Sequence, residues 1–343
     1  MHRCIQLAQN GKGFVAPNPM VGAVIVHNDI IIGEGFHRQY GEAHAEVNAV
    51  ACVKDQSLLE QSTMYVNLEP CSHYGKTPPC TGLIIDKKIP EVVIGCIDPF
   101  PEVSGRGIRI LQEAGVEVTI NVLKEECERL NRRFFTFVQK KRPYIILKWA
   151  QSADGFIDKK RNFGDGEKPV RLSNDFTQLY THKTRAEESA ILVGFNTALL
   201  DNPALTTRSW NGKNPLRIVL DKDLNIPANF NLLDGNIPTL IYTRKKKEPE
   251  KNITYREIEF NKNILPQIMA DLYNRNIQSL IVEGGSMLLN SFIQSNLWDE
   301  AKVETTSILL NSGVPAPYLK GNLLNVLKCK KSVISQYENR QIP

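Results

Sequence analysis

The sequence predicts an α/β protein of two domains, and three observations support this prediction. The chain has 343 residues, which is long for a single hydrophobic core. Strand-like and helix-like segments follow one another in each half, as in layered α/β folds. Between the halves lies the polar segment Lys141-Arg142-Pro143, after which the pattern restarts. We therefore expect one domain over residues 1–142 and a second over residues 143–343.

The first half begins with a short amphipathic helix, expected at 2–10, followed by a hairpin at 21–32. The hairpin is a β-branched run interrupted by the turn signal His27-Asn28-Asp29. Further helices are expected at 44–51, 81–87, 105–114 and 125–140, and further strands at 62–68, 91–97 and 116–122. This succession predicts a layered domain with helices on both faces of a sheet.

The second half repeats the alternation after the boundary. Strands are expected at 144–150, 189–193, 216–221, 239–243 and 279–283. Helices are expected at 174–186, where Asn174 provides an N-cap, and at 287–294. The segments 159–168 and 244–251 are rich in charge and are expected to be surface loops.

The composition is that of an ordinary globular protein, with 42% hydrophobic and 23% charged residues. The net charge of +5 is compatible with a small anionic substrate and with nucleic acid. The chain has no apolar run of membrane-spanning length, and its first residues lack a signal-peptide core. Seven scattered cysteines do not suit a secreted disulfide framework. We therefore expect a cytoplasmic protein that does not bind membranes.

One histidine and two cysteines form a candidate zinc site. They are His44 in His44-Ala45-Glu46, Cys71 after Glu69-Pro70, and Cys80 after a proline pair. One imidazole and two thiolates leave the fourth position of a tetrahedral zinc ion to water, as in catalytic sites. Glu46 would not be a ligand but would carry protons, because H-x-E followed by P-C-x-x-C is typical of zinc deaminases that act on bases.

The spacing of the two cysteines departs from that signature, since eight residues separate them instead of two. A loop rich in serine, glycine and proline can still fold back and bring Cys80 to the same metal as Cys71. Each of these residues alone is more often a surface histidine or a buried thiol. Their occurrence together and in this order favours the metal site.

At these residues the first half resembles the bifunctional riboflavin biosynthesis protein, a pyrimidine deaminase joined to a reductase. The resemblance is carried by Asn18-Pro19-Met20-Val21-Gly22-Ala23-Val24, by His44-Ala45-Glu46 and by the long loop 70–80, which distinguishes the family from cytidine and tRNA adenosine deaminases. It implies a cytidine-deaminase-like α/β/α zinc domain. It also implies a phosphoribosyl substrate held by Asn18, His37, His73, Lys76 and Asp98.

The second half resembles the reductase part of the same family, whose fold is like dihydrofolate reductase. The matching segments are 148–155, Arg185-Ala186, 194–197, 201–208 and 282–285. The resemblance implies that NADPH is lined by Ala150, Thr197, Asp201 and Gly285. It implies that the substrate is held by Arg185, Leu205, Arg208 and Glu283. Two arginines can clamp a phosphate through bidentate hydrogen bonds.

Two features depart from the family pattern. The chain has Arg171-Leu172-Ser173 where the family usually has Trp-Ile-Ser or Trp-Ile-Thr, so an aromatic contact to the cofactor is replaced. A last sheet strand is expected after Tyr337, close to Pro343, so we expect an incomplete edge of the second sheet.

The sequence thus predicts a bifunctional enzyme of riboflavin synthesis that uses Zn²⁺ and NADPH. The first domain would deaminate 2,5-diamino-6-(5-phosphoribosylamino)pyrimidin-4-one, with Glu46 as the catalytic residue, and the second would reduce the ribosyl group to ribityl. We expect a small phosphorylated pyrimidine substrate, no nucleic acid, and a homo-oligomer. One alternative is a deaminase with a degenerate reductase domain. Another is a nucleic-acid deaminase with a binding appendage, which would need stacking aromatic residues and a stronger basic surface.

Overall fold

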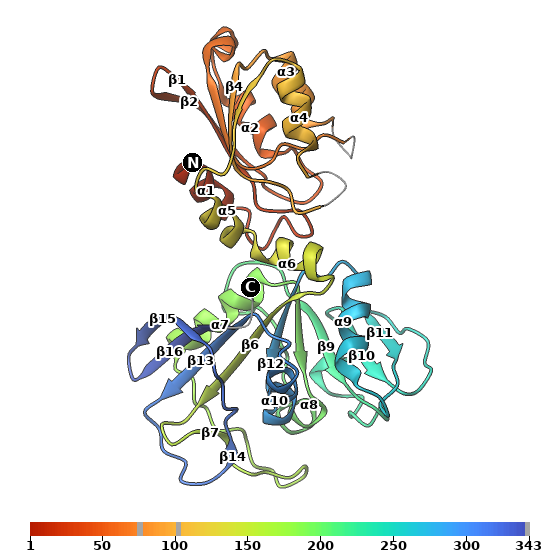
Figure 1. Ribbon diagram of the computed structural model, residues 1–343. Coiled ribbons are helices and arrows are strands. Elements are labelled where there is room, and N and C mark those ends of the chain that lie inside the picture. Colours follow the sequence, from red (N-terminus) through yellow and green to blue (C-terminus); the bar gives the residue numbers. More distant parts are fainter. Residues whose placement is uncertain (74–77, 101–103, 340–343) are drawn as a thin grey trace. The chain divides into compact units, whose positions relative to one another are not determined.

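The computed structural model describes residues 1–73, 78–100 and 104–339 of the chain. Two compact units, Met1–Arg142 and Pro143–Pro343, divide it (Figure 1). Each is a mixed α/β unit built on its own sheet, which confirms the predicted fold class.

The sheet of the first unit has five strands in the order β2-β1-β3-β4-β5. The strands are β1 (Gly22–His27), β2 (Ile30–Phe36), β3 (Thr63–Leu68), β4 (Glu91–Cys96) and β5 (Glu117–Thr119). β1 pairs antiparallel with β2 and β3, whereas β3, β4 and β5 run parallel. Asn28 and Asp29 both have positive φ, which is the conformation of the tight turn predicted for this hairpin.

Helices cover both faces of this sheet, as predicted. They are α1 (His2–Gln9), α2 (Ala45–Cys52), the 3₁₀ turn η1 (Gln56–Gln61), α3 (Cys80–Asp86), α4 (Arg106–Glu113), α5 (Lys124–Leu130) and α6 (Arg132–Lys140). Buried side chains of α2, α3 and α4 pack on one face of the sheet, together with Ile25 and Val66. α1 packs on the opposite face through Cys4 and Leu7 against Val24, because successive residues of β1 point to opposite faces.

The helix predicted at 125–140 is wrong in one respect, because it consists of two helices that meet at Asn131. The side chain of Asn131 accepts a hydrogen bond from Met20 N (2.8 Å) and donates one to Met20 O (2.9 Å). The buried side-chain amide of Asn131 bonds to a distant backbone segment and so fixes the chain at this point. Hydrophobic periodicity along a helix does not indicate such a bond.

The second unit contains a nine-stranded sheet in the order β11-β10-β9-β8-β12-β6-β13-β16-β15. Its strands are β6 (Tyr144–Gln151), β8 (Ala190–Val193), β9 (Leu216–Leu220), β10 (Thr239–Thr243), β11 (Ile253–Glu257), β12 (Ser279–Glu283), β13 (Glu300–Thr306), β15 (Asn322–Cys329) and β16 (Ser332–Glu338). The strands from β11 to β13 in this order are parallel, and β16 and β15 are antiparallel. A separate ribbon pairs β7 (Phe156–Asp158) with β14 (Val314–Pro315).

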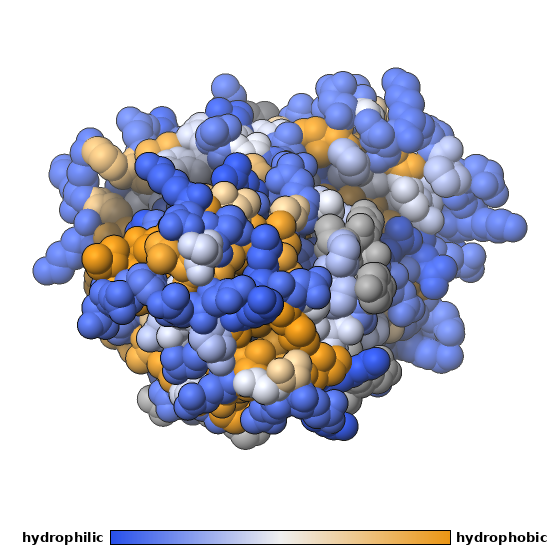
Figure 2. Space-filling view, turned by 90° about the horizontal axis from the view of Figure 1, so that it is seen from above, coloured by the Kyte–Doolittle hydropathy of each residue, from blue (hydrophilic) through white to orange (hydrophobic). Residues whose placement is uncertain are grey.

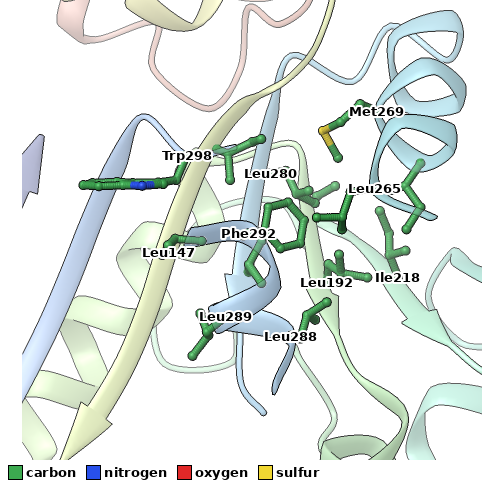
Figure 3. Close-up of a cluster of buried hydrophobic side chains, with 14 of the residues drawn as sticks. Leu147, Leu192, Ile218, Leu265, Met269, Leu280, Leu288, Leu289, Phe292 and Trp298 are labelled. Atoms are coloured by element: carbon green, nitrogen blue, oxygen red, sulfur yellow. The ribbon is translucent and has the colours of Figure 1, made fainter. Parts of the chain in front are cut away.

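The core of the second unit lies between this sheet and the helices on its two faces. The helices are α7 (Asp175–Glu187), α8 (Phe195–Asp201), the 3₁₀ turn η2 (Asn231–Leu233), α9 (Ile264–Asn274) and α10 (Ser286–Gln294). Figure 3 shows Leu265 and Met269 of α9 and Phe292 of α10 packed over Leu192 and Leu280 of the sheet. The N-cap predicted at Asn174 is confirmed, because its side chain accepts hydrogen bonds from Phe176 N and Thr177 N.

The expectation of an incomplete sheet edge is wrong. β16 runs from Ser332 to Glu338 and pairs on one side with β13 and on the other with β15. Sequence reasoning missed β13 because its buried residues include Glu300, Lys302 and Glu304. These charged groups find partners inside the unit, as in the hydrogen bond from Lys302 Nζ to Thr184 Oγ1 at 3.3 Å.

The surface has the mixture of hydrophilic and hydrophobic side chains that the composition of a globular protein predicts. On the face shown in Figure 2, hydrophilic side chains surround smaller hydrophobic areas. Within residues 1–73, 78–100 and 104–339, no helix is both long enough and apolar enough to cross a bilayer.

Candidate active sites

The structure brings the three predicted zinc ligands together. His44 Nδ1 lies 3.5 Å from Cys71 Sγ and 3.4 Å from Cys80 Sγ, and the three ligand atoms all lie within 4.8 Å of one another. Tetrahedral zinc with ordinary Zn–N and Zn–S bonds separates nitrogen from sulfur by about 3.5 Å. The donor atoms and their spacing therefore fit a zinc ion with three protein ligands.

Local structure explains why these residues meet. His44 is the N-cap residue of α2 and Cys80 is the first residue of α3, so both side chains project from helix starts. Cys71 follows β3, and its Sγ accepts a hydrogen bond from Cys80 N at 3.3 Å. Cys80 thus lies beside Cys71 although eight residues separate them in the sequence, as the sequence analysis expected.

The electrostatics of the cluster favour a thiolate at Cys71. Hydrogen bonds from the Cys80 thiol, from His44 and from the Cys80 amide lower the pKa of the Cys71 thiol. The hydrogen bond to Cys71 raises the pKa of His44. A stable thiolate is the form of cysteine that binds metal.

Glu46 lies beside the cluster in the first turn of α2 and is 3% exposed. Burial, and then the charge of Cys71, raise the pKa of its carboxyl group. A carboxyl group that is not a metal ligand can accept a proton and release it again during a reaction.

A cavity of about 560 Å³ opens in front of the metal ligands, a volume that suits a small organic ligand. Four of the five predicted substrate residues line it: Asn18, His37, His73 and Asp98. The fifth, Lys76, lies outside the described residues. Sequence reasoning missed Tyr40, Phe100 and Phe134, whose rings line the same cavity and can stack on a planar base.

A hydrogen-bond chain orients the polar wall of this cavity. His37 Nδ1 bonds to the carbonyl oxygen of Ala43 at 3.1 Å, so its Nε2 can accept from Asn18 Nδ2, also at 3.1 Å. Burial lowers the pKa of His37, which agrees with a neutral ring. The amide oxygen of Asn18 then remains an acceptor for a ligand. Burial also raises the pKa of Asp98 to about 6.

Glu69 is a further residue at this site that sequence reasoning did not assign. Its buried carboxylate accepts hydrogen bonds from three amides, those of Asp98 (3.2 Å), Gly105 (3.0 Å) and Gly107 (2.9 Å). It thereby joins the end of β3 to the segment after β4, which holds Asp98 at the cavity.

The second unit contains a larger cavity of about 1140 Å³ at the carboxyl ends of its parallel strands. Ligands of open parallel sheets bind at this edge. All eight residues that the sequence analysis assigned to the second site line the cavity: Ala150, Arg185, Thr197, Asp201, Leu205, Arg208, Glu283 and Gly285.

The glycine pair between β12 and α10 needs to be glycine for two reasons. Gly284 and Gly285 have φ of 97° and 67°, values that side-chain-bearing residues rarely adopt. A Cβ atom at either position would also approach the side chain of Thr197 to 3.1–3.2 Å. The backbone of this turn therefore lies open at the cavity wall.

The two predicted arginines have different surroundings. Arg185 donates from Nη2 to Glu283 Oε2 (2.6 Å), from Nε to Glu283 Oε1 (3.2 Å) and from Nη1 to the Thr206 carbonyl (3.1 Å). Arg208 is exposed, and within the described residues it makes one long hydrogen bond, to Thr206 Oγ1 at 3.4 Å. Arg185 is thus already held by the protein, whereas Arg208 keeps most of its donors for a ligand.

Glu283 is ionised by its neighbours. Burial alone would raise its pKa, but the charges of Arg185 and Lys148 outweigh burial and lower it to about 2. Lys148 lies opposite Glu283 on the adjacent strand β6 and lines the cavity, yet sequence reasoning quoted it only as part of a motif.

Asp201 also has a partner that the sequence did not reveal. Its Oδ1 accepts a hydrogen bond from Arg161 Nη2, and the same guanidinium binds Asp158. Arg161 belongs to the segment predicted as a charged surface loop, but its side chain is 4% exposed. Arg171, which replaces the usual tryptophan, lines the cavity and pairs with Asp175.

Comparisons with protein-family models match both units. Residues 143–341 match the RibD C-terminal domain. Residues 1–96 match the cytidine and deoxycytidylate deaminase zinc-binding region.

Comparisons with individual proteins extend over nearly the whole chain. The riboflavin biosynthesis protein RibD of Bacillus amyloliquefaciens is 39% identical over 93% of this chain and 86% of its own length. RibD of Escherichia coli is 34% identical over 91% of this chain and 88% of its own. The crystal structure of a diaminohydroxyphosphoribosylaminopyrimidine deaminase/5-amino-6-(5-phosphoribosylamino)uracil reductase from Thermotoga maritima superposes with a TM-score of 0.89. It is 35% identical and the match covers 99% of this chain and 97% of that one.

Proposed function

The chain belongs to the RibD family of riboflavin biosynthesis proteins, and from this membership we propose how its two units divide the work. The protein is a bifunctional enzyme, a deaminase and a reductase, that uses Zn²⁺ and NADPH. Residues 1–142 carry out the deamination, and residues 143–343 carry out the reduction.

In the first unit, His44, Cys71 and Cys80 hold zinc. Zinc held by these residues would supply Lewis-acid chemistry that lowers the pKa of a water molecule. The Glu46 carboxylate would accept a proton from water as the water oxygen adds to the ring carbon that bears the amino group. Glu46 would then give that proton to the amino group, which leaves as ammonia, so that an oxygen replaces the amino group.

The substrate is 2,5-diamino-6-(5-phosphoribosylamino)pyrimidin-4-one. Its planar ring fits between the aromatic side chains of the first cavity, and Asn18 and Asp98 offer hydrogen-bonding groups to it. His73 and Lys76 supply donors for the phosphate. The pKa of Asp98, raised to about 6 by burial, lets its carboxyl group serve as a donor or an acceptor near neutral pH.

In the second unit, bound NADPH would supply the hydride, and solvent a proton, for the reduction of the ribosyl group to ribityl. Ala150, Thr197, Asp201 and the open backbone at Gly285 line the cofactor. Arg208 binds the substrate phosphate with its free donors, and Leu205 packs beside the substrate. Arg185 and Glu283, which form a largely buried ion pair on the wall of the same cavity, hold the substrate.

The observation that carries this proposal is the convergence of the ligand atoms of His44, Cys71 and Cys80 beside Glu46 at the wall of the first cavity. The test is incubation of the whole chain with the diaminopyrimidine, with and without NADPH, followed by mass spectrometry. We expect a product in which a hydroxyl or carbonyl oxygen replaces one amino group without NADPH, and a further gain of two hydrogens with it. Deamination without any reduction would instead support the alternative of a degenerate reductase.

Zinc binding has its own test. We expect one zinc per chain after reconstitution, measured by metal analysis, and little zinc in Cys71→Ser. Less than about a tenth of an equivalent in the parent would contradict the assignment of the three ligands.

The homo-oligomer is proposed from the edge strand β15. Four of its side chains are exposed apolar groups, namely Leu323, Leu324, Val326 and Leu327. The strand carries one charged residue, Lys328, although exposed edges are usually protected by charge. A second copy of the chain that pairs along β15 would cover these groups. Light scattering on the parent and on Leu327→Lys tests this, with a monomeric parent as the contradicting result.

We further propose that the enzyme acts in the cytoplasm and does not bind nucleic acid. The seven cysteines are free, as in a reducing compartment. The charged segment 244–251 is partly neutralised, because Arg244 pairs with Asp223 and Lys247 with Glu250. Tight RNA binding that weakens steeply with salt would contradict the second statement.

A further inference from the structure

We propose that His182 is a positioning residue of the second site, where its imidazole accepts a hydrogen bond from a hydroxyl group of the substrate's ribosyl chain. This inference rests on the proposed reductase function. It assigns a sugar-binding role to a residue that neither the sequence motifs nor the resemblance singled out.

The first step is the position of His182 on α7. Gln178, Thr181, His182 and Arg185 all line the large cavity, and their spacing of three, four and seven residues places them on one helix face. His182 lies one turn before Arg185, whose guanidinium is fixed by Glu283. The imidazole is therefore next to the wall that the substrate is expected to contact.

The second step is an unpaired polar atom. His182 is 3% exposed, and within the described part of the chain its Nδ1 is buried without a hydrogen-bond partner. Buried polar atoms in folded proteins are nearly always paired, and an orphan costs free energy that a bound ligand can recover. His182 lines the cavity, and the unpaired nitrogen of its ring thus points to a ligand.

The third step is the chemical character of that nitrogen. Burial, and then the charges of Arg185 and Arg208, lower the pKa of His182, so the ring is neutral at physiological pH. A backbone hydrogen bond with Thr206 acts in the opposite direction on this pKa. Because Nδ1 has no partner among the described residues, this bond is assigned to Nε2, which carries the hydrogen when its partner is a carbonyl. Nδ1 is then the acceptor of the neutral imidazole.

The fourth step is the choice of ligand group. A phosphate at neutral pH offers acceptors almost exclusively, and it suits the donors of Arg208 instead. A hydroxyl group offers a hydrogen to an acceptor, and a ribosyl chain carries several. The two neighbouring side chains therefore divide the sugar phosphate between them: Arg208 binds its phosphate and His182 binds a hydroxyl.

The experiment uses the whole chain and compares two probes, ribose 5-phosphate and inorganic phosphate, by isothermal titration calorimetry. In His182→Leu we expect ribose 5-phosphate to bind about three- to tenfold more weakly, the worth of one neutral hydrogen bond. Inorganic phosphate should bind as in the parent. Arg208→Ala should weaken both probes. In steady-state reduction, His182→Leu should raise the KM for the pyrimidine substrate and leave the KM for NADPH unchanged.

Two conservative variants separate binding from folding. Asn places an amide oxygen near the position of Nδ1, so His182→Asn should recover most of the affinity for ribose 5-phosphate. Gln places its amide near Nε2, so His182→Gln should bind ribose 5-phosphate as weakly as His182→Leu does. This variant still tests the role of Nδ1 if His182→Leu folds poorly. Thr184→Val is the matched control, because Thr184 is buried on the same helix but does not line the large cavity.

The inference is overturned if His182→Leu and His182→Gln bind ribose 5-phosphate as the parent does. It is equally overturned if these variants lose inorganic phosphate to the same degree, or if Thr184→Val reproduces their loss. If the variants give these contradicting results but the parent reduces the substrate, the inference about His182 fails and the proposed function stands. A parent that neither reduces the substrate nor binds ribose 5-phosphate overturns both.

Discussion

Single side chains in the first unit have separate tasks although they lie close together. His44, Cys71 and Cys80 present nitrogen and sulfur atoms at the spacing of zinc ligands. Glu46 projects from the same helix start as His44 but is a carboxyl group with a raised pKa, suited to proton transfer. The metal and the proton carrier can therefore be changed independently by mutation.

We expect Glu46→Gln to retain one zinc per chain and to deaminate about 10²- to 10⁴-fold more slowly, because the amide cannot carry the proton. Metal analysis and a deamination assay measure the two effects. Glu42→Gln is the matched control, since Glu42 lines the same cavity from an exposed position. Deamination by Glu46→Gln within about threefold of the parent would contradict the role of this residue.

A second residue-scale prediction concerns acid stability. The pKa of Glu283 is about 2 in the folded protein, against an ordinary value of 4.5, so the ionised form is favoured by folding. Its contribution is present above about pH 4.5 and is lost as the pH falls toward 2, and it is on the order of 3 kcal/mol. The melting temperature of the second unit should fall over this range.

Glu283→Gln should be less stable than the parent at neutral pH and should show a smaller loss between about pH 4.5 and 2. Calorimetric melting of both proteins measures the difference, with Glu257→Gln, an exposed carboxylate on β11, as the control. Parallel pH profiles for the parent and Glu283→Gln would show that the ion pair with Arg185 has no such effect.

At the scale of elements, the connections carry as much of the site as the strands and helices do. Asn131 divides α5 from α6 and fixes Met20, next to the segment that contains Asn18. Arg161, in the segment after β7, holds Asp201 at the end of α8. In both places a loop side chain that bonds across the unit sets the position of a cavity-lining residue.

We expect Asn131→Ala to lower the free energy of unfolding of the first unit by about 1–3 kcal/mol, because Met20 N loses its partner inside the core. Calorimetry on the whole chain should show a lower melting temperature for the transition of the first unit and an unchanged one for the second. Asn10→Ala, an exposed position after α1, should leave both transitions unchanged. A shift of less than a degree in Asn131→Ala would mean that the break between α5 and α6 does not depend on this side chain.

At the scale of the whole molecule, each unit has its own sheet, core and cavity. The residues of the first candidate site all lie in Met1–Arg142, and those of the second all lie in Pro143–Pro343. We therefore expect that the chemistry of the two sites can be separated by cutting the chain between them.

We expect a fragment of residues 1–142 to bind zinc and to deaminate the diaminopyrimidine without NADPH. A fragment of residues 143–343 should reduce the deaminated compound with NADPH and without zinc. Mass spectrometry of the products measures both reactions, and the whole chain is the control. A strict NADPH requirement for deamination would contradict this division.

Much of the protein follows from short segments of sequence. The meeting of His44, Cys71 and Cys80, the hairpin turn at Asn28 and Asp29, and the Asn174 cap were predictable because residue type and spacing express their local chemistry. The first sheet, the strands β6, β8, β9, β10 and β12 of the second sheet, and most helices were predictable because hydrophobic periodicity records which face is buried. The strands β11, β13 and β15 were not predicted. In β13 the buried side chains are charged and find partners within the fold.

The amino-acid sequence by itself thus determined the two-domain α/β class, the three residues that meet as candidate metal ligands, and a part of the lining of each cavity. The tertiary structure alone decided which of those side chains are already engaged. The Arg161–Asp201 contact spans 40 residues of sequence, the Arg185–Glu283 pair 98, and the Asn131–Met20 bonds 111. Charge pairing and an unpaired nitrogen such as that of His182 depend on distances across the folded unit, and spacing along the chain does not record those distances.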